Sequence, residues 1–138
     1  ASRGRGAQLN GHRIRVGSRH ELTESLVGTG VPFLGHCDEQ LDWYTQSLAA
    51  IASRSMGIRR AGAASLDLAY VAAGRLDGFW EMGLNQWDIA AGALLVREAG
   101  GLITDLSGGE GWYDSGNVVC GNSKLMRHLL PLVKWSAA

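Results

Sequence analysis

Most of the chain alternates between segments typical of β-strands and segments typical of α-helices. Apolar and β-branched runs bounded by turn residues predict strands at residues 25–29, 57–60, 77–82, 102–106 and 117–120. Helical spacing of apolar residues, or a high alanine and leucine content, predicts helices at residues 39–53, 63–73, 86–99 and 123–133. This alternation favours an α/β fold, in which a layered sheet has helices on both faces. The strands of such a sheet are joined through the helices by right-handed crossovers.

The first twenty residues break this alternation. Asn10 and Gly11 supply a tight turn, and residues 13–16 alternate between arginine and apolar side chains, which together predict a β-hairpin. A two-stranded hairpin is marginally stable in water unless it joins a larger sheet. We therefore expect residues 1–20 to form a hairpin arm that belongs to the sheet of an absent N-terminal half, and residues 21–138 to form a C-terminal α/β domain.

Charge and composition restrict the class of protein. Lys+Arg and Asp+Glu both total 13, so the net charge is zero, which argues against a dedicated nucleic-acid binder. Five arginines nevertheless precede the first acid, Glu21. An arm that packs against another domain or subunit is the favoured interpretation, and a nucleic-acid arm is the alternative.

Apolar runs and cysteines indicate the cellular compartment of the protein. No apolar run approaches the roughly 18 residues of a membrane span, and no secretory leader is recognisable, so we expect neither membrane insertion nor export. Cys37 and Cys120 are far apart and match no metal-binding spacing. Two thiols without a disulfide framework favour a reducing cytoplasm.

Two carboxylates flank a predicted strand–helix turn. Glu81 ends a strand, and Asp88 lies in the first turn of the next helix, after a short turn that contains Gly83. Ligands of open α/β sheets gather at the carboxyl ends of strands, and Mg²⁺ prefers carboxylate oxygens. From this pattern alone, simple capping of the helix by Asp88 is the better interpretation, and metal binding is the alternative.

A second strand–helix junction is rich in small residues. The segment 59–65 enters Gly62 from a strand and begins a helix with alanines and Ser65. Free N–H groups at such a helix start can hold a phosphate or sugar hydroxyls. Close packing of strand and helix explains the same residues equally simply.

Two tryptophans and two aspartates are expected to have structural rather than catalytic roles. Trp80 and Trp87 are expected to be packing anchors rather than stacking platforms. Asp105 and Asp114 flank a glycine-rich turn and are expected to be solvated.

Residues 87–101, WDIAAGALLVREAGG, resemble the C-terminal signature of inositol monophosphatases, W-D-x-A-A-G-x-x-L-V-x-E-A-G-G. The resemblance extends over nearly the whole chain. It includes residues 3–11, 29–33, 68–75, 77–78 and 114–117. It is strongest to bacterial members, some of which also serve in ribosomal RNA synthesis apart from catalysis.

The resemblance implies a layered α-β-α-β-α fold and Mg²⁺-dependent, lithium-sensitive hydrolysis of phosphate monoesters, commonly by dimers. It implies that Asp88 ligates a metal ion and that Glu81 accepts hydrogen bonds from inositol hydroxyls. Gly62 and Ala64 match positions whose backbone contacts the substrate. Ala63 departs from the family, which usually has serine or threonine there.

Most metal ligands of the family belong to two motifs of its N-terminal half, a G-G-E type motif and D-P-x-D-G-T. The second does not occur in this sequence, and the letters of the first occur only as Gly108-Gly109-Glu110, in the glycine-rich turn of the C-terminal half. We therefore expect a C-terminal half that binds Mg²⁺ poorly and turns over little or no inositol phosphate, or related polyol phosphate, without the missing N-terminal half. The main alternative is a non-catalytic binding module that contacts RNA polymerase or RNA. A truncated product with no function of its own is the third possibility.

Overall fold

The computed structural model describes residues 1–32, 35 and 37–135. Phe33, the last residue of one resemblance segment, and residues 136–138 of the predicted C-terminal domain lie outside the described residues. Among the residues described, no helix combines the length and apolar character that crossing a membrane requires.

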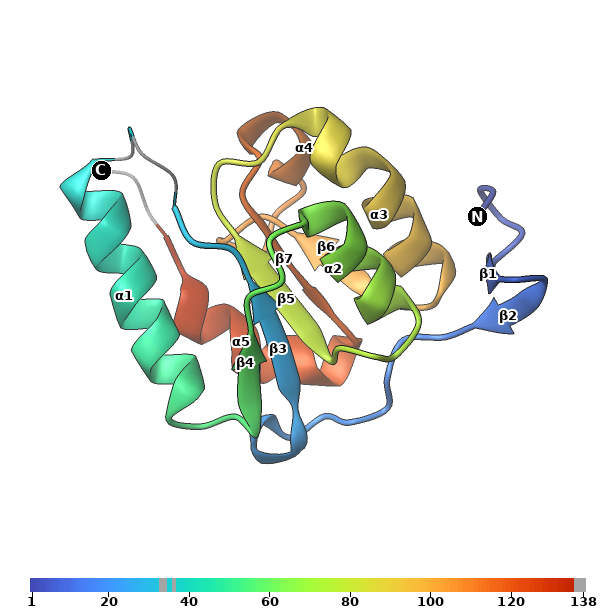
Figure 1. Cartoon of the computed structure of the whole chain (residues 1–138), viewed down its shortest axis with the longest axis horizontal. Helices are drawn as coiled ribbons and strands as arrows, with labels where there is room; N and C mark the ends of the chain where they lie inside the picture. Colours follow the sequence, from blue (N-terminus) through green and yellow to red (C-terminus); the bar gives the residue numbers. More distant parts are fainter. Residues whose placement is uncertain (33–34, 36, 136–138) are drawn as a thin grey trace.

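A five-stranded mixed sheet forms the centre of the molecule (Figure 1). Its strands follow the order β4-β3-β5-β7-β6, and their bounds are Leu26–Thr29 (β3), Gly57–Arg59 (β4), Gly78–Glu81 (β5), Leu102–Thr104 (β6) and Val118–Gly121 (β7). Strand β3 is parallel to both β4 and β5, whereas β7 is antiparallel to β5 and β6. The α/β fold class is confirmed, but the expected crossovers between parallel strands apply only to β4, β3 and β5.

Helices cover both faces of this sheet (Figure 1). Their bounds are Asp38–Ala52 (α1), Ala64–Ala72 (α2), Gln86–Glu98 (α3) and Ser123–Val133 (α5). Side chains alternate across the central strand, so Phe79 packs with α2 and α3 while Trp80 packs with α1 and α5. Two short elements were not predicted, a 3-10 helix (η1, Leu22–Glu24) and α4 (Trp112–Ser115).

Helices α2 and α3 pack closely because the signature segment carries a glycine at their contact. A Cβ atom on Gly92 would lie 2.5 Å from the Cβ of Leu68, so any larger residue would separate the helices. The prediction of packing anchors is confirmed for Trp80, which is fully buried, and is wrong for Trp87, which is 80% exposed. Trp87 lies in the first turn of α3, on the side of the helix away from the core.

The N-terminal segment forms the predicted hairpin. Strands β1 (Ala7–Leu9) and β2 (His12–Ile14) pair antiparallel in a sheet of their own, and Asn10 and Gly11 have the positive φ angles of a tight turn. The hairpin projects beyond α3 (Figure 1). Its assignment to the sheet of another segment stays a prediction.

Glu98 fixes the start of the arm to α3. Its carboxylate accepts hydrogen bonds from the N–H groups of Gly4 (2.6 Å) and Gly6 (2.9 Å). Farther along, the N–H of Val16 donates to the carbonyl of Ala99 at 3.0 Å. The last turn of α3 therefore holds the arm at two places.

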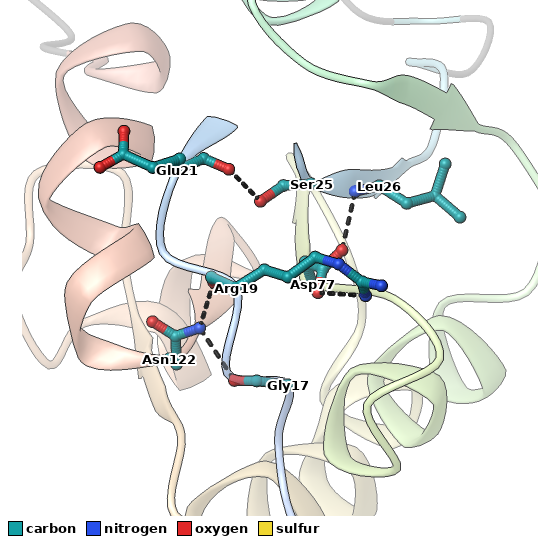
Figure 2. Close-up of polar contacts among 7 residues, drawn as sticks. All are labelled: Gly17, Arg19, Glu21, Ser25, Leu26, Asp77 and Asn122. Atoms are coloured by element: carbon teal, nitrogen blue, oxygen red, sulfur yellow. Dashed lines mark hydrogen bonds and ion pairs between the residues drawn. The ribbon is translucent and has the colours of Figure 1, made fainter. Parts of the chain in front are cut away.

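The last residues of the arm are held across the amino ends of the parallel strands (Figure 2). The side-chain amide of Asn122 donates to the carbonyls of Gly17 (2.9 Å) and Arg19 (2.7 Å). Asp77 accepts a hydrogen bond from the N–H of Leu26 at 2.8 Å and faces the Arg19 guanidinium at 3.7 Å. These contacts leave the opposite edge of the sheet, at the carboxyl ends of the strands, open.

Candidate functional site

One pocket lies at the carboxyl ends of the parallel strands, lined by residues that follow β4 and by the end of β5 and the residues after it. Its volume is about 290 Å³, the scale of a small-molecule site. It is lined by Arg60, Gly62, Ala63, Ala64, Ser65, Glu81, Leu84 and Asp88. All four residues to which the sequence assigned ligand contacts, namely Gly62, Ala64, Glu81 and Asp88, therefore line one pocket, although their roles stay predictions.

Glu81 occupies the inner wall of this pocket because Gly30, the residue that follows β3, has no side chain beside it. A Cβ atom on Gly30 would lie 1.0 Å from Oε1 of Glu81, so the carboxylate fills the space that a side chain at position 30 would need. Glu81 is only 7% exposed, and no described residue donates a hydrogen bond to its carboxylate. Its oxygens are thus available to a ligand with hydrogen-bond donors.

Asp88 caps the helix that carries it. Its Oδ2 atom accepts a hydrogen bond from the N–H of Asn85 at 3.0 Å, across the first turn of α3. The capping interpretation is therefore confirmed. It does not exclude metal binding, because one carboxylate oxygen is engaged and the side chain still lines the pocket.

Asp67 is a carboxylate beside the site that sequence reasoning missed. It lies in α2, is 2% exposed, and its Oδ1 atom has no hydrogen-bond partner among the described residues. A Cβ atom on Gly28 would lie 3.7 Å from this oxygen, so Asp67 lies over a glycine of β3 and Glu81 over Gly30, the residue that follows β3. Its position on the apolar stripe of α2, one turn before the buried Val71, was the available signal.

Two carboxyls in and beside the pocket have raised pKa values. Burial, followed by the negative charges of Asp67 and Asp88, raises the pKa of Glu81 to about 7. Burial raises the pKa of Asp67 to about 6. The guanidinium of Arg60 opposes both shifts but does not cancel them. Perturbed carboxyls in a pocket are typical of functional sites.

The described residues do not complete a metal centre. Within residues 1–32, 35 and 37–135, no group of three or more His, Cys, Asp or Glu side chains is arranged to hold a metal ion. Asp88 and Glu81 supply two carboxylates at one pocket, and a site for Mg²⁺ needs further oxygen ligands.

Asp105 corrects another expectation. Its carboxylate is half-buried and accepts hydrogen bonds from the N–H groups of Ser107 (2.9 Å), Gly109 (2.8 Å) and Gly111 (3.1 Å). Burial raises the pKa of Asp105, but these hydrogen bonds and that of the Ser107 hydroxyl outweigh it and lower the pKa overall. Asp105 therefore organises the glycine-rich loop instead of being a solvated turn residue, whereas Asp114 is exposed as expected.

Comparison with known proteins identifies the relatives of this chain. Residues 1–136 match the family model described as the inositol monophosphatase family. The chain is 54% identical over 134 residues to the Nus factor SuhB of Pseudomonas aeruginosa, covering 97% of this chain and 49% of that protein. It is 49% identical over 132 residues to the inositol-1-monophosphatase of Mesorhizobium japonicum, covering 96% of this chain and 49% of that protein.

Solved structures of similar proteins share the fold of this chain. The crystal structure of the extragenic suppressor protein suhB from Bartonella henselae superposes with a TM-score of 0.92 at 44% identity, covering 99% of this chain and 52% of that one. The Thermotoga maritima IMPase superposes with a TM-score of 0.84 at 38% identity, covering 96% of this chain and 49% of that one. The chain spans about half the length of the relatives it matches, and over that length it belongs to the inositol monophosphatase family.

Proposed function

We propose that this chain supplies one side of the active site of a phosphatase that hydrolyses inositol monophosphates or related polyol phosphates. The observation that carries the proposal is the pocket in which Glu81, Asp88 and the start of α2 meet at the carboxyl ends of parallel strands. The family acts on phosphate esters and is metal-dependent, and one relative is named inositol-1-monophosphatase.

Each pocket residue has a proposed task. The buried carboxylate of Glu81 accepts hydrogen bonds from ligand hydroxyls, which would satisfy oxygens that have no partner among the described residues. The backbone at Gly62 and Ala64 contacts the same ligand. Asp88 ligates a metal ion, proposed to be Mg²⁺ because its donors are carboxylate oxygens.

The metal would neutralise the charge of the phosphate ester and activate water. Because the described residues do not complete its ligand set, we propose that the other ligands belong to a segment outside this chain. The chain alone would then show little or no turnover. Lithium inhibition, association as a homodimer and a cytoplasmic location, the last from the absence of a disulfide framework, are parts of the same proposal.

A second candidate is a non-catalytic binding module in ribosomal RNA synthesis. It is favoured by the name Nus factor SuhB of a relative and by the five arginines of the arm, all of which are exposed (Arg3, Arg5, Arg13, Arg15 and Arg19). Association with RNA polymerase or RNA that weakens with salt and is unchanged in Asp88→Asn would support this candidate.

The test is phosphate release from inositol 1-phosphate with Mg²⁺. The chain is assayed alone and mixed with the part of the Pseudomonas aeruginosa relative that it does not match, made separately. We expect release only in the mixture, reduced at least about 100-fold by Glu81→Gln or Asp88→Asn and unchanged by Glu110→Gln, an exposed carboxylate far from the pocket.

Substantial release by the chain alone would contradict the claim that essential ligands lie elsewhere. If neither sample releases phosphate although the two parts associate, that result would favour the binding-module candidate over the phosphatase.

A further inference from the structure

The start of α2 is not capped by a side chain. Ala63 is the N-cap residue and has no oxygen to offer, and its carbonyl accepts the N–H groups of Leu66 and Asp67. The N–H groups of Ala64 and Ser65, in the first turn, have no partner within the part of the chain that the structure describes. Both residues line the pocket, so two backbone donors are available there.

Arg60 places a cation beside these donors. Its Nη1 atom lies 2.7 Å from the position that a Cβ of residue 62 would take, so the guanidinium lies over Gly62 and lines the pocket. No carboxylate of a described residue lies within 4.0 Å of it. Arg59 differs, because its Nη1 atom donates to the carbonyl of Ile58 at 3.0 Å and it does not line the pocket.

Glu81 independently shows that the pocket is built for a ligand. It is 7% exposed, lines the pocket and receives no hydrogen bond from a described residue. Buried acceptors are almost always satisfied in folded proteins, and because Glu81 lines the pocket, its partners there are water or a bound molecule with donor groups. A carboxylate repels anions, so hydroxyl groups belong near Glu81 and a negative group belongs on the Arg60 side.

We propose that Arg60 and the uncapped start of α2 form an anion subsite, which binds a phosphate or carboxylate group of a polyol whose hydroxyls face Glu81. The proposal rests on the proposed function for the polyol part of the ligand. In the complete enzyme, this group is a substituent other than the phosphoryl group beside Asp88, so the subsite favours those polyol phosphates that carry a second anionic group over inositol monophosphates. The chemistry is that of helix N-termini and arginine acting together on oxyanions.

The test is titration of the isotope-labelled 138-residue chain, followed by the amide signals of Ala64 and Ser65 in NMR spectra. EDTA removes metal ions, so that Arg60 and α2 are the partners left for a phosphate group. The probes are myo-inositol, inorganic phosphate and myo-inositol 1-phosphate. We expect myo-inositol 1-phosphate to bind about tenfold more tightly than myo-inositol, and inorganic phosphate to shift both amide signals.

Two variants and one control sharpen the result. Arg60→Gln should abolish the tenfold preference for the phosphorylated ligand, whereas Arg59→Gln should leave it within about twofold. Ala63→Ser should cap α2, raise the Tm of the free chain by about 3 °C, and weaken phosphate binding, because the serine oxygen competes for the N–H group of Ser65. It tests the subsite even if Arg60→Gln fails to fold.

The outcomes separate the two proposals. Equal affinity for myo-inositol and myo-inositol 1-phosphate, or a full preference retained in both Arg60→Gln and Ala63→Ser, overturns the anion subsite. Phosphate-induced shifts at Ala64 and Ser65 without any binding of myo-inositol support the subsite and count against a polyol phosphatase.

Discussion

The C-terminal end of helix α3 and the pocket beside its N-terminal end contain carboxylates in opposite conditions. Near its C-terminal end, Glu98 is fully engaged by the N–H groups of Gly4 and Gly6, and these hydrogen bonds lower its pKa. Near its N-terminal end, Glu81 and Asp67 are buried without hydrogen bonds from described residues, and burial raises the pKa of both.

The difference separates a structural task from a functional one. A carboxylate that holds two chain segments together uses its oxygens on backbone donors, as Glu98 does for the arm. A buried carboxyl without donors destabilises the fold, and it is retained where a ligand supplies the missing partners. The comparison therefore assigns the pocket end of α3 to function and the arm end to architecture.

The largest effect is expected from Gly30→Ala. Its methyl group would occupy the position of Oε1 of Glu81, so Glu81 must leave its place. We expect binding of myo-inositol to fall at least about 30-fold and the free energy of unfolding to fall by about 2 kcal/mol, as in overpacked cores. Isothermal calorimetry and urea unfolding measure these two quantities.

The matched control is Gly57→Ala, also in a strand of the same sheet. A Cβ atom there meets its nearest neighbours at 3.4 and 3.5 Å, which is ordinary contact. Binding unaffected by Gly30→Ala would show that Glu81 is not a ligand residue.

A smaller effect is expected from pH. The folded-state pKa values of Asp67, about 6, and Glu81, about 7, lie above the ordinary values of 3.8 and 4.5. The folded chain therefore binds more protons than the unfolded chain between about pH 4 and 7, so stability is greatest near the acidic end of this window and falls as pH rises through it. We expect a loss of about 1–3 kcal/mol, measured by urea unfolding at several pH values.

Asp67→Asn identifies the source of this pH dependence. The variant cannot ionise at position 67, so its unfolding free energy should fall less between pH 4.5 and 7.5 than that of the unchanged chain. Stability that rises with pH across this window would contradict the electrostatic comparison.

The smallest effect is expected at the other end of α3. Glu98→Gln replaces a charged acceptor with a neutral one, so the amide protons of Gly4 and Gly6 should exchange faster with deuterium. Myo-inositol binding should stay within about twofold. Glu110→Gln, which removes an exposed ion pair with Arg97, is the control, and equal protection of Gly4 in both variants would dismiss the proposed role of Glu98.

The sequence was most informative where local pattern decides structure. The Asn10-Gly11 turn and helix α5 lie where they were predicted, because turn chemistry and apolar spacing act over a few residues. The antiparallel direction of β7 was not predicted, because pairing direction depends on the path of the chain between distant strands. The four residues of α4 are too few to show a period.

The site was predictable in part because two of its residues belong to one local strand–helix pattern. Glu81 and Asp88 flank a strand–helix turn, and such turns gather at one edge of a sheet. Asp67 and Gly30 were missed because their importance arises from proximity in space. Asp67 joins the site from another helix, and Gly30 matters through the carboxylate of a neighbouring strand.

The most direct test of the comparison is the titration of individual side-chain carboxyls by ¹³C NMR on the 138-residue chain without metal ions. The account predicts pKa values of about 7 for Glu81 and about 6 for Asp67, together with a value for Glu98 below the ordinary range of glutamate. Three ordinary values would contradict it, because the two ends of α3 would then be electrostatically alike.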